Sequence, residues 1–322
     1  MRTIALEEHF ATPAFLSGPG HAMAEQARAA GGGRIIDMLG DLGEGRIAAM
    51  DQAGIDVQVL SLTAPGVEQM PPHDAVLLAR DTNDHLAAAV DRHPDRFAAF
   101  ATVATAAPDK AAEELERVVR EHGFKGVLIN GHTQGRYLDD EFFWPILERA
   151  EALGVPIYLH PTPPPRQVIK ASYVGNYPGE VADILATSAW GWHIETATHV
   201  LRIVLSGAFD RYPGLQFVVG HMGEGLSFMM PRFEQIMSHV VKLERPLGAY
   251  FSDNLHYTFA AFNWTPTFLN LLLQVGADRI LFATDHPYGS MENARSFLDR
   301  LPVSRSDSER IAHGNAERLL GF

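Results

Sequence analysis

Short apolar runs recur along the chain and alternate with longer segments whose apolar positions have helical spacing. Eight of these runs are expected to form strands, at residues 3–10, 57–62, 97–103, 126–130, 155–159, 215–220, 256–260 and 279–284. Their apolarity is nearly continuous, which is typical of parallel strands that are covered on both faces. The run at 256–260 is the weakest of the eight.

The segments between the strands mostly carry helix patterns and helix end signals. Helices are expected at 46–54, 74–93, 108–122, 141–153, 194–209, 224–241 and 266–275, with two short helices at the end of the sequence. Two segments lack such a pattern. Residues 11–42, rich in Gly, Ala and Pro, are expected to be a long loop, and the Pro-rich stretch from 161 to about 190 an irregular insertion.

Eight strands alternating with helices predict a (β/α)8 barrel of the α/β class. The 322 residues are expected to form one barrel domain, 1–322, with the irregular insertion over the carboxyl-terminal face of the barrel. The alternative is an open, doubly wound sheet. It is disfavoured because neither G-x-G-x-x-G nor G-x-x-x-x-G-K-[ST], the phosphate-binding fingerprints of such sheets, occurs in the chain.

Composition narrows the classes of function. Hydrophobic residues make up 46% and charged residues 20% of the chain, as in ordinary globular proteins. The formal charge of −13, without a basic stripe, argues against nucleic-acid binding. No cysteine is present, which excludes thiolate ligands and a Cys nucleophile. No run is long enough to span a membrane and no secretion signal is recognisable, so a cytoplasmic protein is expected.

Carboxylates and imidazoles stand where four of the expected strands end. Glu7 and His9 close the first strand and share one side of it, because strand side chains alternate. His160 follows the fifth strand, His221 the sixth and Asp285 the eighth. In a (β/α)8 barrel these strand ends meet at the face that carries active sites. Nitrogen and oxygen donors without sulfur suit zinc or manganese, so a divalent metal site is expected.

Four motifs at these strand ends resemble those of a known family: Glu7-x-His9, Tyr158-Leu159-His160-Pro161, Gly220-His221-Met222-Gly223-Glu224 and Ala283-Thr284-Asp285-His286-Pro287. They are similar to motifs of the amidohydrolase superfamily. Within it they resemble the branch of metal-dependent nonoxidative decarboxylases that includes aminocarboxymuconate semialdehyde decarboxylase and the γ-resorcylate and 2,3-dihydroxybenzoate decarboxylases. A glutamate at position 7, where histidine is more widespread, favours the hydroxybenzoate enzymes.

The resemblance implies a role for each of these residues. Glu7, His9, His160 and Asp285 would bind the metal, with Asp285 also the proton donor and His221 a catalytic group above the metal. Glu224 would support His221 by hydrogen bonding, although a carboxylate there could instead stabilise a helix N-terminus. Many hydrolytic relatives bridge two metals with a lysine. Only Lys125 lies near an expected strand, and it precedes that strand, so one ion, Zn²⁺ or Mn²⁺, is expected.

Two arginines match family positions that contact the substrate. Arg46 and Arg232 would bind the carboxylate or ring oxygens of a small aromatic acid, and Arg232 would reach a neighbouring active site in a homodimer or homotetramer. An arginine fork suits a carboxylate, but an arginine on a helix is more often a solvated surface residue. Both assignments rest on the resemblance alone.

The function expected from the resemblance is decarboxylation of an ortho-hydroxy aromatic acid of the dihydroxybenzoate type. A metal-dependent hydrolase of a small cyclic or aromatic acid, and a binding barrel without turnover, are the alternatives. After Asp285 the chain departs from the family pattern with His286-Pro287-Tyr288-Gly289, so the ring substituents stay open. Trp190 and Trp192 are expected to pack rather than to bind substrate, and eleven further histidines, His193 among them, receive no role.

Overall fold

The strands all run parallel and belong to two hydrogen-bonded sets. A computed structural model describes residues 1–322. Its strands are β1 (Ile4–Phe10), β2 (Val57–Leu62), β3 (Phe97–Ala99), β4 (Val127–Asn130), β5 (Ile157–His160), β6 (Phe217–Val219), β7 (Leu255–Thr258) and β8 (Ile280–Leu281). Neighbouring strands pair in the orders β1-β2-β3 and β4-β5-β6-β7-β8.

Two further contacts close these sets into a barrel. A bridge between Ala101 and Val127 joins the chain after β3 to β4. At the other junction, the amide of Leu6 donates to Phe282 O (3.1 Å) and the amide of Asp285 to Glu7 O (2.9 Å). The eight strands therefore form a closed (β/α)8 barrel, which confirms the expected fold and excludes the open sheet.

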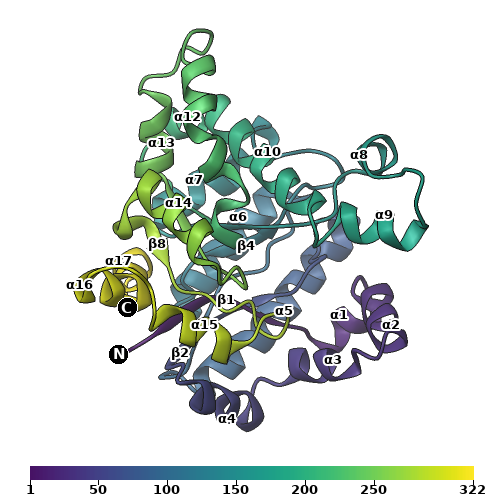
Figure 1. Ribbon diagram of the computed structural model, residues 1–322. Coiled ribbons are helices and arrows are strands. Elements are labelled where there is room, and N and C mark those ends of the chain that lie inside the picture. The colour runs from purple at the N-terminus through teal and green to yellow at the C-terminus, as the bar shows by residue number, and fades with distance from the viewer.

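Helices surround the barrel in the order expected from the sequence (Figure 1). Those that cover it are α4 (Glu44–Ala53), α5 (Pro72–Arg92), α6 (Pro108–His122), α7 (Trp144–Leu153), α10 (Gly191–Leu205), α12 (Leu226–Met237), α14 (Thr265–Val275) and α15 (Met291–Leu298). The others are α1 (Pro13–Ser17), α2 (His21–Ala29), α3 (Gly33–Gly40), α8 (Arg166–Ser172), α9 (Gly179–Ala186), α11 (Ala208–Arg211), α13 (Leu247–Asp253), α16 (Arg305–Glu309) and α17 (Asn315–Leu320). Single turns lie at η1 (Glu141–Phe143), η2 (His221–Gly223), η3 (Ala277–Arg279) and η4 (Arg310–Gly314). None of the helices has the length and hydrophobicity that crossing a membrane requires.

The two unpatterned segments are more ordered than expected. The expectation of a loop at 11–42 is wrong, because α1, α2 and α3 occupy most of it, and α8 and α9 interrupt the segment at 161–190. Short helices escape prediction here because they bury few side chains: α8 buries none and α2 only Ala24. Their stability comes from packing on neighbours rather than from a periodic apolar face.

A small apolar cluster fills the barrel below the strand ends. It includes Ile4 and Leu6 of β1 and Tyr158 of β5, and it is completed by Ala316 and Leu320 of α17. The register of β1 against β2 shifts between Ala5 and Glu8. This irregularity changes which side chains of β1 face inward, from Ile4 and Leu6 in the cluster to Glu7 and His9 above it.

The loop that follows β2 forms one wall above the strand ends and is held to β4 by a buried carboxylate. Glu68 is 2% exposed, and its Oε1 accepts a hydrogen bond from the amide of Asn130 (2.7 Å). Its Oε2 has no hydrogen-bond partner. Burial raises the pKa of Glu68 from 4.5 to about 7, against the lowering effect of its hydrogen bonds.

Glu68 should make the stability of the protein depend on pH. Between pH 4.5 and pH 7 the folded state keeps a proton that the unfolded state has lost, so the free energy of unfolding falls as pH rises through this range. The difference amounts to about 3 kcal/mol. Buried Glu8, whose pKa burial raises to about 8, adds a fall of its own. Glu68→Gln is therefore expected to reduce the total fall by about 3 kcal/mol, which urea unfolding at pH 5 and pH 8 measures. Exposed Glu25→Gln is the control and should keep the pH dependence of the wild type. The same pH dependence in Glu68→Gln and wild type would contradict the role of Glu68.

Candidate active site

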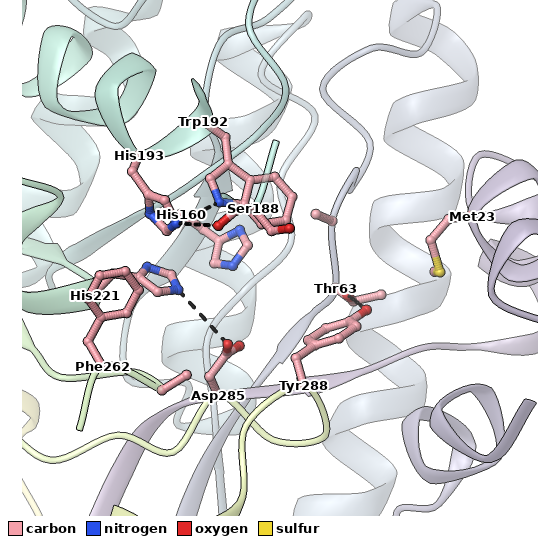
Figure 2. A pocket seen from close by; sticks show the side chains of 12 residues that line it. Met23, Thr63, His160, Ser188, Trp192, His193, His221, Phe262, Asp285 and Tyr288 are labelled. Carbon is pink, nitrogen blue, oxygen red and sulfur yellow. Dashed lines mark hydrogen bonds and ion pairs between the residues drawn. The ribbon is translucent and has the colours of Figure 1, made fainter. Parts of the chain in front are cut away.

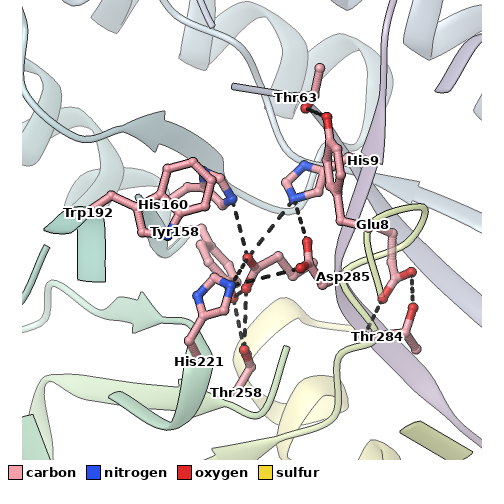
Figure 3. A network of polar contacts seen from close by, with 12 residues as sticks. Glu8, His9, Thr63, Tyr158, His160, Trp192, His221, Thr258, Thr284 and Asp285 are labelled. Carbon is pink, nitrogen blue, oxygen red and sulfur yellow. Dashed lines mark hydrogen bonds and ion pairs between the residues drawn. The ribbon is translucent and has the colours of Figure 1, made fainter. Parts of the chain in front are cut away.

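The residues expected to bind a metal lie together at the carboxyl ends of the strands (Figure 3). Glu7 and His9 come from β1, His160 from β5, and Asp285 from the turn after β8. His9 Nε2 lies 3.3 Å from Asp285 Oδ1 and 4.0 Å from Glu7 Oε1, and His160 Nε2 lies 3.4 Å from the same Glu7 oxygen. The structure therefore brings all four side chains to one point.

The two carboxylate oxygens of Glu7 have different surroundings. Oε2 accepts hydrogen bonds from the hydroxyls of Tyr158 and Thr258, which also lie 2.9 Å from each other. Oε1 has no hydrogen-bond partner and faces the imidazoles of His9, His160 and His221. The protein thus holds one oxygen in place and leaves the other free to coordinate.

This donor set fits a divalent metal ion. Besides Glu7 Oε1, both ring nitrogens of His9 and Nδ1 of His160 are buried without a hydrogen-bond partner. Buried polar atoms are rarely left unpaired, and a cluster of them indicates a missing ligand or ion. Glu7, His9 and His160 bring their donor atoms within 4.8 Å of one another, as do Glu7, His221 and Asp285. Carboxylate and imidazole donors suit zinc or manganese.

The close approach of Glu7 to β6 requires a glycine at position 220. A Cβ added to Gly220 would lie 2.6 Å from Glu7 Oε2 and 3.1 Å from the Tyr158 hydroxyl. Gly220→Ala should therefore displace Glu7 and weaken metal binding about tenfold or more. Titration of the metal-free protein with Mn²⁺ and Zn²⁺ measures this effect. Gly33→Ala is the control, because a Cβ at position 33 meets nothing within 4 Å. Equal metal affinity in Gly220→Ala and Gly33→Ala would show that Gly220 is not needed to place Glu7.

Backbone strain is concentrated at the turns that carry the site. His221, Met222, Glu224 and Asp285 all have positive φ angles, at 46°, 58°, 56° and 61°. Such angles are uncommon for residues with a side chain and persist where surrounding contacts impose them. For Asp285 these contacts are visible: its amide donates to Glu7 O and its carbonyl accepts from Gly289 N (2.7 Å).

The carboxylates around His221 favour its protonated form. Burial alone would lower its pKa, but the negative charges of Glu224 and Glu7 raise the pKa of His221 to about 10. Its Nε2 lies 3.7 Å from Glu7 Oε1 and 3.9 Å from Asp285 Oδ2. Glu7 in turn has a lowered pKa, because the neighbouring imidazoles outweigh the effect of its burial.

Glu224 binds two histidines rather than a helix end. Its Oε1 lies 2.7 Å from Nδ1 of His221, and its Oε2 is hydrogen-bonded to Nδ1 of His193. It precedes α12 by two residues, so it does not serve as the cap of that helix. Burial alone would raise the pKa of Glu224, but the charge of His221 and the bonds from both histidines lower it. His193, which received no role from the sequence, therefore belongs to the site.

A pocket of about 470 Å³ opens above these groups (Figure 2). Polar residues supply part of its lining: Thr63, His160, Ser188, His193, His221, Asp285 and Tyr288. The remainder is apolar or aromatic: Met23, Ala64, Trp192, Ala261 and Phe262. The mixture suits a ring with a few polar substituents. No lysine or arginine lines the pocket.

The two arginines expected to bind substrate are not in this pocket. Arg46 lies in α4 and is buried, with its N–H groups donating to Asp41 O (2.7 Å), Met38 O (3.1 Å), His9 O (2.6 Å) and Gln58 Oε1 (3.2 Å). Its guanidinium therefore supports the main chain of β1 instead of facing a ligand. Arg232 is exposed on α12, where its only hydrogen bond goes to Gln235 (3.4 Å).

Several pocket residues gave no sufficient signal in the sequence. Met23 comes from α2, in the segment expected to be a loop. Trp192 was expected to pack, but it lines the pocket, whereas Trp190 is exposed. Tyr288 was noted only as a departure from the family pattern. Its hydroxyl is hydrogen-bonded to Thr63 (2.7 Å), and its ring contacts His9 edge to face.

A closed parallel barrel with carboxylates and imidazoles at the carboxyl ends of its strands defines a class, the metal-dependent barrel enzymes. Comparison with known proteins makes this class specific, because the amidohydrolase family model matches residues 36–322. The chain belongs to the amidohydrolase family. The family and the decarboxylase branch expected from the sequence are thereby confirmed.

Three relatives show how complete the similarity is. The gamma-resorcylate decarboxylase of a Polaromonas species is 36% identical over 98% of this chain and 97% of its own length. A dihydroxybenzoic acid decarboxylase from Polaromonas, solved with manganese and the inhibitor 2-nitroresorcinol, has 35% identity and a TM-score of 0.90, covering 99% of this chain and 97% of that one. A 5-carboxyvanillate decarboxylase from Novosphingobium aromaticivorans, solved with manganese and 4-hydroxy-3-methoxy-5-nitrobenzoic acid, has 33% identity and a TM-score of 0.91, covering 100% and 96%.

Proposed function

We propose that this protein is a metal-dependent carboxy-lyase that removes CO2 nonoxidatively from an ortho-hydroxy aromatic acid. The observation that carries the proposal is the convergence of Glu7, His9, His160 and Asp285 beneath a partly aromatic pocket. Full-length relatives named as decarboxylases of dihydroxybenzoates support this chemistry.

Glu7, His9, His160 and Asp285 would hold one divalent ion, Zn²⁺ or Mn²⁺. Manganese in two related structures favours Mn²⁺. When bound, the ion supplies Lewis acidity to the carboxylate and hydroxyl oxygens of the substrate. The protein prepares the site by fixing Glu7 through Tyr158 and Thr258.

Loss of CO2 from an aromatic acid requires protonation of the ring carbon first. Direct cleavage would leave a carbanion in the ring plane, where resonance cannot stabilise it. Protonation of the carbon that bears the carboxylate avoids this, because the electrons of the breaking C–C bond then restore the aromatic ring. Asp285 lines the pocket and is the proposed donor of that proton.

His221 would act beside Asp285 on the same side of the pocket. Its Nε2 lies 3.9 Å from Asp285 Oδ2, so it can stabilise the negative charge of the substrate and, after each turnover, pass on to Asp285 a proton taken up from solvent. Glu224 holds the other nitrogen of His221 and thereby sets the orientation of the ring. Arg46 would have a supporting role through its hydrogen bond to His9 O.

Arg232 would complete the site in an assembly of identical chains. The pocket has no basic residue of its own besides histidine, although its proposed substrate is an anion. Arg232 lies on α12 beside exposed apolar side chains, Phe228 (76%) and Met229 (51%) among them. We propose that α12 contacts a second copy and that Arg232 reaches the neighbouring pocket, in a homodimer or homotetramer. Light scattering of wild type and Phe228→Glu tests this, and a monomeric wild type would refute it.

A product assay in D2O tests the proposed reaction. Purified protein is analysed for bound metal and then incubated with salicylate and with the dihydroxybenzoates. The expected result is release of CO2, with one deuterium at the ring carbon that carried the carboxylate. CO2 release without this label would show that no exchangeable acid such as Asp285 delivers a proton to this carbon. A ring-opened acid or an amine in place of CO2, from a wider panel of cyclic acids, would establish the hydrolase alternative.

A further inference from the structure

His193 lies beside the catalytic histidine at the pocket wall, on a helix that carries none of the proposed metal ligands. It lies in the first turn of α10, directly after the segment that holds α8 and α9. It lines the pocket together with Trp192, also in α10, and Ser188, which lies between α9 and α10 (Figure 2). Its ring packs edge to face on His221, with centroids 4.8 Å apart.

Both ring nitrogens of His193 are engaged by the protein. Nδ1 faces Glu224 Oε2, which can only accept, so Nδ1 carries the hydrogen of this bond. Nε2 lies 3.1 Å from Trp192 Nε1, a donor, and 3.1 Å from Ser188 O, an acceptor. One of these two partners can bond Nε2 whether or not it is protonated. The ring is therefore held toward Glu224 in either protonation state and has no free nitrogen for a ligand.

The two oxygens of Glu224 are divided between two imidazoles. Oε1 lies against Nδ1 of His221, and Oε2 accepts from His193. Glu224 is 2% exposed, so without His193 its Oε2 would be a buried oxygen with no partner. The carboxylate would then turn or shift to regain a bond, and His221 would lose its fixed orientation.

We propose that His193 is a positioning residue that holds Glu224 and, through it, the catalytic ring of His221. The contact also connects the turn between α9 and α10 to the catalytic group, because Ser188 O of that turn and the indole N–H of Trp192 lie against Nε2 of His193. The expected loss of turnover rests on the proposed function. The expected effect of His193 on the orientation of the His221 ring does not.

Two substitutions distinguish the contribution of the Nδ1 hydrogen bond from that of the Nε2 contacts. Asparagine places an amide nitrogen near the position of Nδ1, and glutamine places one near the position of Nε2. His193→Asn should keep the bond to Glu224 and stay within about threefold of wild-type kcat. His193→Gln and His193→Phe should lower kcat about 10- to 100-fold with KM within about twofold, as for other residues that orient a catalytic group. Metal content and melting temperature are measured for each variant.

A double-mutant cycle tests whether His193 acts through Glu224. In a Glu224→Gln background, His193→Phe should lower kcat less than twofold further, because the connection is already broken. Equal losses for His193→Asn and His193→Gln, or an undiminished effect of His193→Phe in the Glu224→Gln background, would overturn the proposal.

A second readout needs no turnover. The ring ¹⁵N resonances of His221 in the protein loaded with diamagnetic Zn²⁺, assigned by their absence in His221→Asn, should shift in His193→Phe and His193→Gln but not in His193→Asn. Unchanged resonances in all three variants would refute the positioning role. If wild type releases no CO2 from any acid while these shifts appear, the proposed reaction fails and the role of His193 stands.

Discussion

Asp285→Asn is expected to lower the rate of CO2 release by about 10³-fold or more while the protein stays folded. The loss follows because an amide cannot give its proton to a ring carbon as a carboxylic acid can. The fold should survive because asparagine, like aspartate, tolerates the positive φ of 61° at this position. The hydrogen bonds from Asp285 N to Glu7 O and from Gly289 N to Asp285 O use the main chain and remain.

The measurement is single-turnover CO2 release at saturating substrate and metal. Metal content is determined on the same samples, because Asp285 is also a proposed ligand. Exposed Asp81→Asn is the matched control and should behave as wild type. A metal-loaded Asp285→Asn protein within tenfold of the wild-type rate would show that the ring proton comes from another group.

Glu7→Gln is expected to reduce metal affinity by at least about 100-fold, the second of the two largest effects. Glutamine has the size of glutamate and can still bond Tyr158 and Thr258 through one atom. It lacks the charge, however, and its other atom competes poorly as a ligand among His9, His160 and His221. The change therefore removes the one carboxylate that β1 contributes to the proposed ligand set.

Metal-dependent stabilisation provides the readout. Saturating Mn²⁺ should raise the melting temperature of wild type, since a ligand that binds only the folded state stabilises it. The same addition should leave Glu7→Gln nearly unchanged, and its activity should fall with its metal content. Surface Glu25→Gln serves as the control. An equal melting-temperature rise in Glu7→Gln and wild type would remove Glu7 from the ligand set.

The strands and the strand-end residues could be predicted because barrel geometry converts sequence position directly into location. A residue at the carboxyl end of a buried apolar run must lie at the active face, so Glu7, His160 and Asp285 could be placed together without coordinates. Segments outside the repeating pattern follow no such rule. The helices at 11–42 and α8 and α9 depend on contacts with distant parts of the chain, and their pocket residue Met23 was missed for that reason.

The roles of side chains on helices were harder to predict than those on strands. Arg46 matched a family position, yet the carbonyls around α4 satisfy its guanidinium, which the sequence does not reveal. The prediction for His193 was wrong in the opposite direction, because it assigned no role to a residue of the site. His193 is one of fifteen histidines in the chain, and its place in a helix follows no pattern that would single it out. Its importance appears only in the structure, where the second oxygen of Glu224 needs a partner.

The way the barrel closes has a consequence for biosynthesis. β1 is made first, but it completes its hydrogen bonding only with β8, and the interior beside Ile4 and Leu6 is filled only when α17 docks. Glu7 and His9 can therefore meet Asp285, the last of the four proposed ligands, only after nearly the whole chain has been synthesised. If these four residues bind the proposed metal ion, fragments of the chain that end before Asp285 should bind it weakly.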